Sequence, residues 1–205
     1  MKAINSFIKN SIGSLFSIDE YKLFKESYKK ALNRTKISLE FKKLTELKDW
    51  HYTENSLKHL TSRFFSIKAI SVKSNRRYWC QPIIDQPEIG LLALLGTIRN
   101  KRLEFLVQLK VEPGNINCIQ ISPTIQATKS NIEQVHKGSK VKFIELVINE
   151  SINNLVLLDC ELSEQNSRFF RKKNRNLIKI FDSDEIQLEE NFIWLTIGQI
   201  KQLSL

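Results

Sequence analysis

The sequence predicts an α/β protein in which a helical N-terminal arm precedes a domain built on β-sheet. Two patterns carry this prediction: apolar residues recur at helical spacing through roughly the first 50 residues, and short apolar runs with period-two alternation follow later. All four prolines and three of the six glycines lie between residues 82 and 123, where we expect the tightest turns. A chain of 205 residues is long enough for one large domain with an extra arm.

The first predicted helix is amphipathic. Segment 4–16 places six apolar residues on one face: Ile4, Phe7, Ile8, Ile12, Leu15 and Phe16. Such a helix can lie on a membrane surface, dock on a partner subunit or pack on its own domain. Because its polar face carries only Lys2 and Lys9 as cations, we favour docking on a partner over membrane binding.

The rest of the arm is also predicted to be helical. A second helix is expected from Ser17, where Glu20 three residues on completes a capping box. A third apolar face at helical spacing lies within residues 38–50. We therefore interpret residues 1–50 as a helical arm and candidate dimerisation element, and residues 51–205 as the main domain.

Residues 103–121 are predicted to form a β-hairpin. Apolar and polar residues alternate on both sides of the turn Pro113-Gly114-Asn115. The polar side, continued into the next segment, is rich in amides and hydroxyls, which suit a ligand covered in hydroxyls and carbonyls. These polar residues are Gln108, Lys110, Glu112, Asn115, Asn117, Gln120, Ser122, Gln126, Thr128, Ser130 and Asn131. A sheet face that merely contacts water is the alternative reading.

Further apolar runs predict strands on both sides of this hairpin. These strands are expected over residues 64–72, from residue 79 into a Pro-containing bend, and over 91–98, 155–160 and 177–181. The segment that begins at Phe192 is predicted to open a short C-terminal helix.

Charge and cysteine content bear on the class of protein. The formal net charge of +10 lies wholly in residues 1–79, whereas residues 80–205 are neutral overall. Positive charge spread over predicted helices is typical of helical faces that contact water. We therefore do not expect nucleic acid as a partner. No apolar run approaches a membrane span, and no signal-peptide pattern is present at the N-terminus. Cys80, Cys118 and Cys160 are far apart, so their spacing fits neither a zinc site nor a disulfide framework and favours buried reduced thiols. We therefore expect a cytoplasmic protein without a membrane partner.

A cluster of cations near residue 170 is a second candidate site. Five of them lie within eight residues: Arg168, Arg171, Lys172, Lys173 and Arg175. The planar fork of arginine makes paired hydrogen bonds to phosphate oxygens, so the cluster suits a diphosphate. The preceding segment 164–167 adds the carboxylate of Glu164 together with amides and a hydroxyl that suit a sugar or a base. A charged loop is the alternative.

These motifs, in this order, resemble the NDP-hexose 2,3-dehydratases of deoxysugar biosynthesis over roughly residues 50–205. The resemblance is carried by Trp50, His59, Trp79-Cys80-Gln81-Pro82, Gln86, Glu88-Ile89-Gly90, Gln108, Lys110, Glu112-Pro113-Gly114-Asn115, Ser122-Pro123-Thr124, Gln126, Ser130-Asn131, His136, Ser163-Glu164-Gln165, Ser167-Arg168-Phe169, Asn174-Arg175-Asn176 and Trp194-Leu195-Thr196. It implies a Nudix-hydrolase-like fold, with a mixed sheet flanked by helices, and action on a nucleotide-linked, typically dTDP-linked, 4-keto-6-deoxyhexose. Family members usually carry the domain as a tandem pair, whereas this chain has one copy. This difference leaves three alternatives open: the chain is active alone, it pairs as a homodimer that recreates the two-copy arrangement, or it only binds. A homodimer is the expected arrangement.

The chemistry that the resemblance implies needs no cofactor and no metal. The C4 ketone acidifies the C3 proton, a base removes it to give an enolate, an acid assists loss of the C2 hydroxyl as water, and a 3,4-diketo-2,6-dideoxy sugar results. Glu112, His136 and His59 are the candidates for base and acid, and either Lys110 or an asparagine amide is the candidate to stabilise the enolate. The Nudix signature with its paired glutamates does not occur in the sequence, so Mg²⁺-dependent pyrophosphate hydrolysis is not expected.

The resemblance also implies binding roles. Arginines are expected to hold the diphosphate, a tryptophan to stack on the base or sugar, and the polar residues of 115–131 to contact the hexose. The expected substrate-binding set outside that segment is Arg168, Arg171, Arg175, Trp79, Trp194, Gln81, Gln108 and Glu164. Two alternatives to a dehydratase stay open: a non-catalytic nucleotide-sugar-binding subunit and a basic nucleic-acid-binding module.

Overall fold

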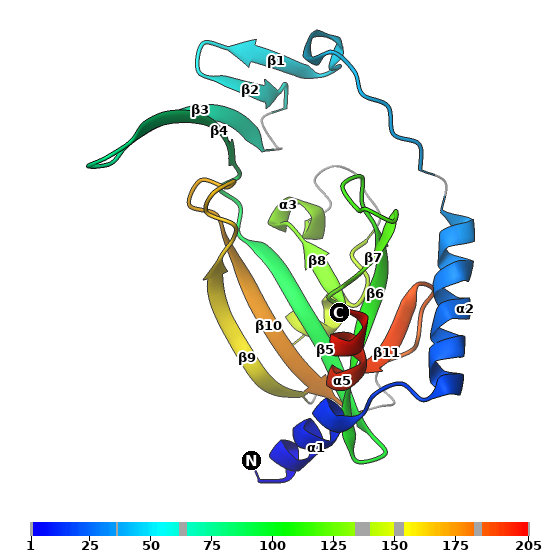
Figure 1. The fold of residues 1–205 in the computed structure, drawn as a ribbon. Helices are drawn as coiled ribbons and strands as arrows, with labels where there is room; N and C mark the ends of the chain where they lie inside the picture. The colour runs from blue at the N-terminus through cyan, green and yellow to red at the C-terminus, as the bar shows by residue number, and fades with distance from the viewer. Residues whose placement is uncertain are drawn as a thin grey trace.

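The computed structural model describes residues 2–35, 37–61, 65–133, 140–149, 154–182 and 186–204, which form two sheets and several helices (Figure 1). The smaller sheet is antiparallel and consists of β1 (Trp50–Thr53), β2 (Ser56–His59), β3 (Ser66–Lys73) and β4 (Tyr78–Asp85). The larger sheet has the order β11 (Phe192–Thr196), β6 (Arg102–Val111), β5 (Gly90–Arg99), β10 (Lys173–Phe181) and β9 (Asn154–Ser163). Two short strands extend it, β7 (Ile119–Ser122) on β6 and β8 (Ile125–Ala127) on β5.

The larger sheet is mixed, because β5 and β10 are parallel while its other pairs are antiparallel. Among the described residues the helices are α1 (Lys2–Gly13), α2 (Ile18–Arg34), α3 (Lys129–Ile132), α4 (Ile144–Ile148) and α5 (Ile197–Leu203), together with the 3₁₀ turn η1 (Leu44–Glu46). The predicted α/β class, a mixed sheet flanked by helices, is therefore confirmed.

The predicted hairpin is confirmed as β6 and β7. Val111 lies opposite Ile119, so the Pro-Gly-Asn segment forms the connection between the two strands. Within this connection Asn115 donates its side-chain amide to the carbonyls of Lys110 and Cys118, at 3.0 and 3.2 Å. An asparagine that satisfies two backbone carbonyls stabilises the turn itself.

The central strand β5 is packed on both faces. Leu91, Ala93 and Leu95 point to one face, where α4 and β8 contribute further core residues. Leu94 points to the other face, where the core includes Phe105 and residues of α1 and α5. This burial on both sides explains why β5 reads as a continuous apolar run in the sequence.

Helix α1 packs on its own domain, the third of the three roles considered for it. Ser11 is fully buried, donates its hydroxyl to the Leu103 carbonyl and accepts from the Ile197 amide at 2.9 Å. The Thr196 hydroxyl donates to the Ser14 carbonyl at 2.6 Å. These bonds connect α1 to β6 and to the start of α5.

The close approach of α1 to α5 requires Gly198. A Cβ atom there would lie 2.4 Å from the Ser14 carbonyl oxygen and 2.7 Å from that of Ile12, and both are backbone atoms. We therefore expect Gly198→Ala to lower the free energy of unfolding by about 1–3 kcal/mol in urea denaturation. Gly114→Ala is the control, because no heavy atom lies within 4 Å of its Cβ position. An equal effect of both substitutions would contradict this account.

Helix α2 begins where the sequence predicts, but the segment that follows it is not the predicted helix. The capping box of Ser17 and Glu20 is present, and the Tyr28 hydroxyl donates to the Ile119 carbonyl at 3.1 Å, which joins α2 to the β6–β7 hairpin. The prediction of a helix over residues 38–50 is wrong, since η1 is the only helical turn there and Trp50 begins a strand. The division of the chain at residue 50 and the dimerisation role of the arm stay predictions.

Two further predictions need correction. Residues 192–196 form strand β11, and the C-terminal helix begins only at Ile197. The three cysteines are free thiols, but Cys80 and Cys118 are exposed, so the prediction that they are buried is wrong for these two. No helix among the described residues is long and apolar enough to cross a membrane.

Candidate functional site

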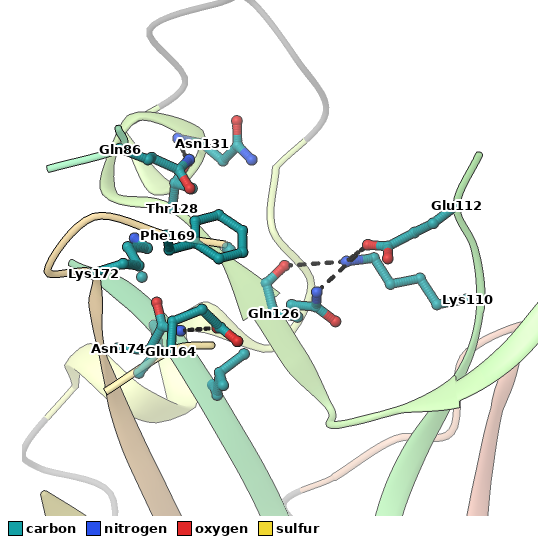
Figure 2. Close-up of a pocket in the computed structure, with 14 residues that line it drawn as sticks. Gln86, Lys110, Glu112, Gln126, Thr128, Asn131, Glu164, Phe169, Lys172 and Asn174 are labelled. Carbon is teal, nitrogen blue, oxygen red and sulfur yellow. Dashed lines mark hydrogen bonds and ion pairs between the residues drawn. The ribbon is translucent and has the colours of Figure 1, made fainter. Parts of the chain in front are cut away.

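A cavity of about 270 Å³ lies at the edge of the larger sheet where β5 and β10 begin and β6 and β8 end. Gly90 pairs with Asn174 in parallel, and Ala127 pairs with Leu91 in antiparallel, so the strand ends meet at one edge. The segment between β9 and β10 contributes the remaining side (Figure 2). The lining residues are Gln86, Gly90, Leu91, Leu92, Lys110, Glu112, Gln126, Ala127, Thr128, Asn131, Glu164, Phe169, Lys172 and Asn174.

One wall of the cavity, which we call the β6 wall, consists of Lys110 and Glu112 at the end of β6. The Lys110 Nζ lies 2.8 Å from the Glu112 Oε1, and Gln126 on β8 contacts both groups (Figure 2). Strand alternation places positions 110 and 112 on the same face. The wall therefore offers a carboxylate that is paired with a cation.

The opposite wall, which we call the β10 wall, consists of Glu164, Lys172 and Asn174 (Figure 2). Asn174 donates its side-chain amide to the Glu164 Oε2 at 2.6 Å. Lys172 is only about 5% exposed and donates to the Glu88 carbonyl. Burial lowers the pKa of the Lys172 amine below its ordinary value, against the opposing effect of the Glu88 and Glu164 carboxylates.

Glu88 connects the β10 wall to helix α3. Its carbonyl accepts from Lys172, while its carboxylate accepts from the Ser130 hydroxyl at 2.9 Å. Ser130 in turn lies 3.0 Å from the hydroxyl of Thr128, which caps α3 and lines the cavity. The network holds three separate segments of the cavity in fixed relation.

Six of the predicted site residues line this cavity: Lys110, Glu112, Gln126, Thr128, Asn131 and Glu164. Ser130 lies beside it through its bonds to Glu88 and Thr128. Five others belong to the hairpin and its turn and do not line the cavity: Gln108, Asn115, Asn117, Gln120 and Ser122.

The arginines of the predicted diphosphate cluster lie outside the cavity. Arg175 points to β9, where its guanidinium makes two hydrogen bonds to Asp159 at 2.6 and 2.8 Å. This pairing lowers the pKa of the Asp159 carboxyl and raises that of Arg175. Arg168 is exposed and Arg171 lies over the Phe170 ring at 5.1 Å. Both flank Phe169, which lines the cavity.

Gln81 contacts the segment between β9 and β10, and Trp79 is connected to that segment through Gln81; neither residue lines the cavity. The Trp79 indole donates to the Gln81 side chain at 2.9 Å, and the Gln81 amide donates to the Ser167 carbonyl at 2.9 Å. Trp194 lies far from this edge, because it contacts Arg99 at the opposite end of β5, about 30 Å along the strand from Gly90.

Of the two histidines proposed as acid or base, the structure describes only His59, and His59 does not line the cavity. His59 lies on β2, where its ring packs edge-on against Trp50 and its Nδ1 lies 2.9 Å from the Thr61 hydroxyl. His136 lies outside the described residues. Within the described part of the chain, no three His, Cys, Asp or Glu side chains gather as a metal site; the absence of a cofactor stays a prediction.

Six residues at this site had no place in the expected catalytic or substrate-binding set: Gln86, Glu88, Gly90, Phe169, Lys172 and Asn174. Lys172 was named in the cation cluster and the other five among the motifs that carry the resemblance. For two of them the strand pattern was a further signal. Exposure alternates from Arg171 to Arg175, so that Lys172 and Asn174 are buried while Arg171, Lys173 and Arg175 are exposed. The strand period, applied to the cation cluster, would have selected Lys172 over the arginines.

Gly90 fits this arrangement because it faces Asn174 directly. A Cβ at position 90 would lie 2.7 Å from the Asn174 Oδ1. The glycine therefore leaves room for the amide that holds Glu164.

Comparisons with a family profile and with curated proteins both find 2,3-dehydratases of nucleotide-linked hexoses. The sequence profile of the family described as NDP-hexose 2,3-dehydratase matches residues 22–204. A dTDP-4-dehydro-6-deoxy-alpha-D-glucopyranose 2,3-dehydratase from Amycolatopsis orientalis is 40% identical over 168 residues, covering 77% of this chain and 35% of the relative. One of the same name from Saccharopolyspora spinosa is 39% identical over 166 residues, covering 80% and 34%. The chain thus spans about a third of the length of the curated relatives it matches.

A structural comparison finds a C. elegans Ap4A hydrolase with a TM-score of 0.34 and 12% identity, covering 54% of this chain and 81% of that chain.

Proposed function

The chain belongs to the NDP-hexose 2,3-dehydratase family, and on this premise we propose that it removes water from C2 and C3 of a nucleotide-linked 4-keto-6-deoxyhexose. The substrate is dTDP-linked, as the names of the relatives say of theirs. The observation that carries the proposal is that two carboxylates, Glu112 and Glu164, face one small polar cavity from opposite walls (Figure 2). Elimination next to a ketone requires a base and an acid at adjacent carbons.

Each carboxylate has a role in the proposal. Glu112, which is paired with Lys110, takes the proton from C3. Glu164, positioned by Asn174, gives a proton to the C2 hydroxyl as it leaves. The C2 and C4 oxygens flank C3 on the sugar ring, so both can face the β10 wall while the base approaches C3 from the β6 wall. The resulting enol then becomes the 3,4-diketo sugar by taking a proton at C2 and releasing the proton of its C3 hydroxyl.

The size of the cavity sets which part of the substrate it encloses. At about 270 Å³ it falls just below the range of ~300–1,000 Å³ typical of pockets that bury a drug-sized ligand. We therefore place the hexose ring inside and the nucleotide outside. Arg168 and Arg171, which flank Phe169 at the rim, are the proposed diphosphate contacts, and Trp79 is the proposed surface for the base.

This placement separates the arginines by role. Arg168→Ala is expected to raise KM for the nucleotide sugar about tenfold, because a hydrogen bond to a charged group is worth about 1.5–3 kcal/mol. Arg175→Ala is the matched control and is expected to leave KM within about twofold of the value for the unaltered enzyme. Arg175 pairs with Asp159 on β9, and such a surface ion pair is worth ~0.2–1 kcal/mol to stability. Steady-state kinetics checks both, and a larger effect for Arg175 would contradict the placement.

Incubation with dTDP-4-keto-6-deoxyglucose, followed by mass spectrometry, tests the function. A product lighter by one water supports the dehydratase. Because the chain spans about a third of its relatives' length, a non-catalytic nucleotide-sugar-binding subunit is the second candidate, and saturable dTDP binding without loss of water would favour it. Steeply salt-dependent oligonucleotide binding without dTDP binding would contradict both.

We also propose that two copies of the chain associate as a homodimer. The support is β9, at one end of the larger sheet, which exposes four apolar residues: Leu155, Val156, Leu158 and Leu162. Exposed apolar edge strands pair with other chains. Sedimentation equilibrium tests this, and a monomer mass at every concentration would contradict it. Cytoplasmic localisation stays a prediction.

A further inference from the structure

Lys172 is the more deeply buried of the two ammonium groups that line the cavity. It is about 5% exposed, whereas the side chain of Lys110 is 23% exposed. Lys110 is also neutralised by its ion pair with Glu112. In the described part of the chain Lys172 makes no ion pair and donates to the Glu88 carbonyl, and the Glu88 and Glu164 carboxylates act on its pKa less than burial does. Since attraction between charges is strongest where water is excluded, a new negative charge in the cavity would be stabilised most by Lys172.

The backbone directs this side chain inward. Lys172 and Asn174 are buried while Lys173 and Arg175 are exposed, as strand alternation requires. Arg171, just before Lys172, has a φ of 51°, a left-handed conformation that is uncommon for residues other than glycine. The chain therefore enters β10 through an unfavourable backbone conformation at Arg171. Of the five neighbouring cations, Lys172 is the one whose side chain lines the cavity.

We propose that Lys172 binds the C4 carbonyl oxygen of the keto-sugar and stabilises the negative charge that forms there. An ammonium has three N–H donors, and the Glu88 carbonyl takes one, which leaves donors for the substrate oxygen. Removal of the C3 proton moves the C4–O π electrons onto oxygen. Cleavage of the C2–O bond returns them to a C4 carbonyl and leaves a C2–C3 double bond, and the departing hydroxyl takes a proton to become water. Lys172 keeps its proton throughout.

This inference rests on the proposed function and moves to Lys172 the role that the sequence alone favoured for Lys110. A purely structural Lys172 would instead hold the segment before β5 through the Glu88 carbonyl. The two roles differ in what they recognise. A group bound to the C4 oxygen distinguishes a keto-sugar from its nucleotide, whereas a structural group does not.

Calorimetric titration with dTDP-4-keto-6-deoxyglucose and with dTDP alone separates these roles. Lys172→Met is expected to weaken keto-sugar binding about tenfold or more while changing dTDP binding less than about threefold. Lys173→Met is the matched control, because this neighbouring lysine is exposed and pairs with Glu161 at 3.5 Å. It is expected to change neither affinity. Equal weakening of both ligands by Lys172→Met, or no weakening of either, would overturn the proposal.

A second measurement uses the unaltered chain and does not depend on how the variant folds. In a lysine-labelled NMR titration, keto-sugar binding is expected to raise the pKa of the Lys172 amine, and dTDP is expected not to. A Lys172 resonance that responds equally to both ligands would overturn the proposal. Failure of the dehydratase function would look different: the keto-sugar would bind with this Lys172 dependence, but no water would be lost.

Discussion

Glu112→Gln is expected to lower kcat for water loss by roughly 10²–10⁴-fold, the contribution of a general base in proton transfer. The amide keeps the size of the side chain and can still accept a hydrogen bond from Lys110, but it cannot take a proton from C3. Binding of dTDP should therefore change little. In deuterated water, exchange at C3 of the keto-sugar should stop together with the loss of water.

Glu145→Gln controls for the loss of a paired glutamate. Glu145 lies on α4, outside the cavity lining, and its carboxylate is 3.3 Å from the Lys140 Nζ. The kcat of the Glu145→Gln enzyme should stay within about twofold of that of the unaltered enzyme, because most surface substitutions have small effects. A Glu112→Gln enzyme with normal kcat would remove Glu112 from the role of base.

Glu164→Gln is expected to lower kcat by a similar factor of roughly 10²–10⁴, because the leaving hydroxyl then lacks its acid. The glutamine oxygen can still accept the hydrogen bond that Asn174 donates to Glu164, so the wall should keep its shape. The difference from Glu112→Gln lies in the isotope experiment. With Glu112 intact, C3 should still exchange its proton with deuterated water although no water is lost.

The matched control for this second substitution is Glu161→Gln. Glu161 lies on β9 near the same turn, is exposed and pairs with Lys173 at 3.5 Å. Its kcat should not change beyond about twofold. If Glu164→Gln blocked C3 exchange while Glu112→Gln allowed it, the two carboxylates would have the reverse roles.

The parts of the fold that could be predicted from the sequence are those with a local cause. The β6–β7 hairpin and the Ser17 capping box each depend on residues close in sequence. The segment 38–50 was misread because leucines at helical spacing also occur in extended chain, and there η1 is the only helical turn formed. Strand β11 depends on pairing with β6, more than 80 residues earlier, which no local pattern reveals.

The site was only partly predictable, for a similar reason. Lys110, Glu112 and Gln126 were found because alternation along one hairpin and its extension brings them to one face. The arginines were favoured over Lys172 on chemical type alone, although strand parity decides which side chain enters the cavity. His59 was a candidate by its titration range, yet its strand belongs to the other sheet.

The central claim is that the hexose ring lies in the cavity between the β6 wall and the β10 wall. A crystal structure of the Glu112→Gln variant with dTDP-4-keto-6-deoxyglucose tests it most directly. The account predicts the ring between residue 112 and Glu164, with the C4 oxygen beside Lys172 and the diphosphate towards Arg168 and Arg171. A sugar bound elsewhere, for example on the face of the smaller sheet, with the cavity free of ligand, would contradict it.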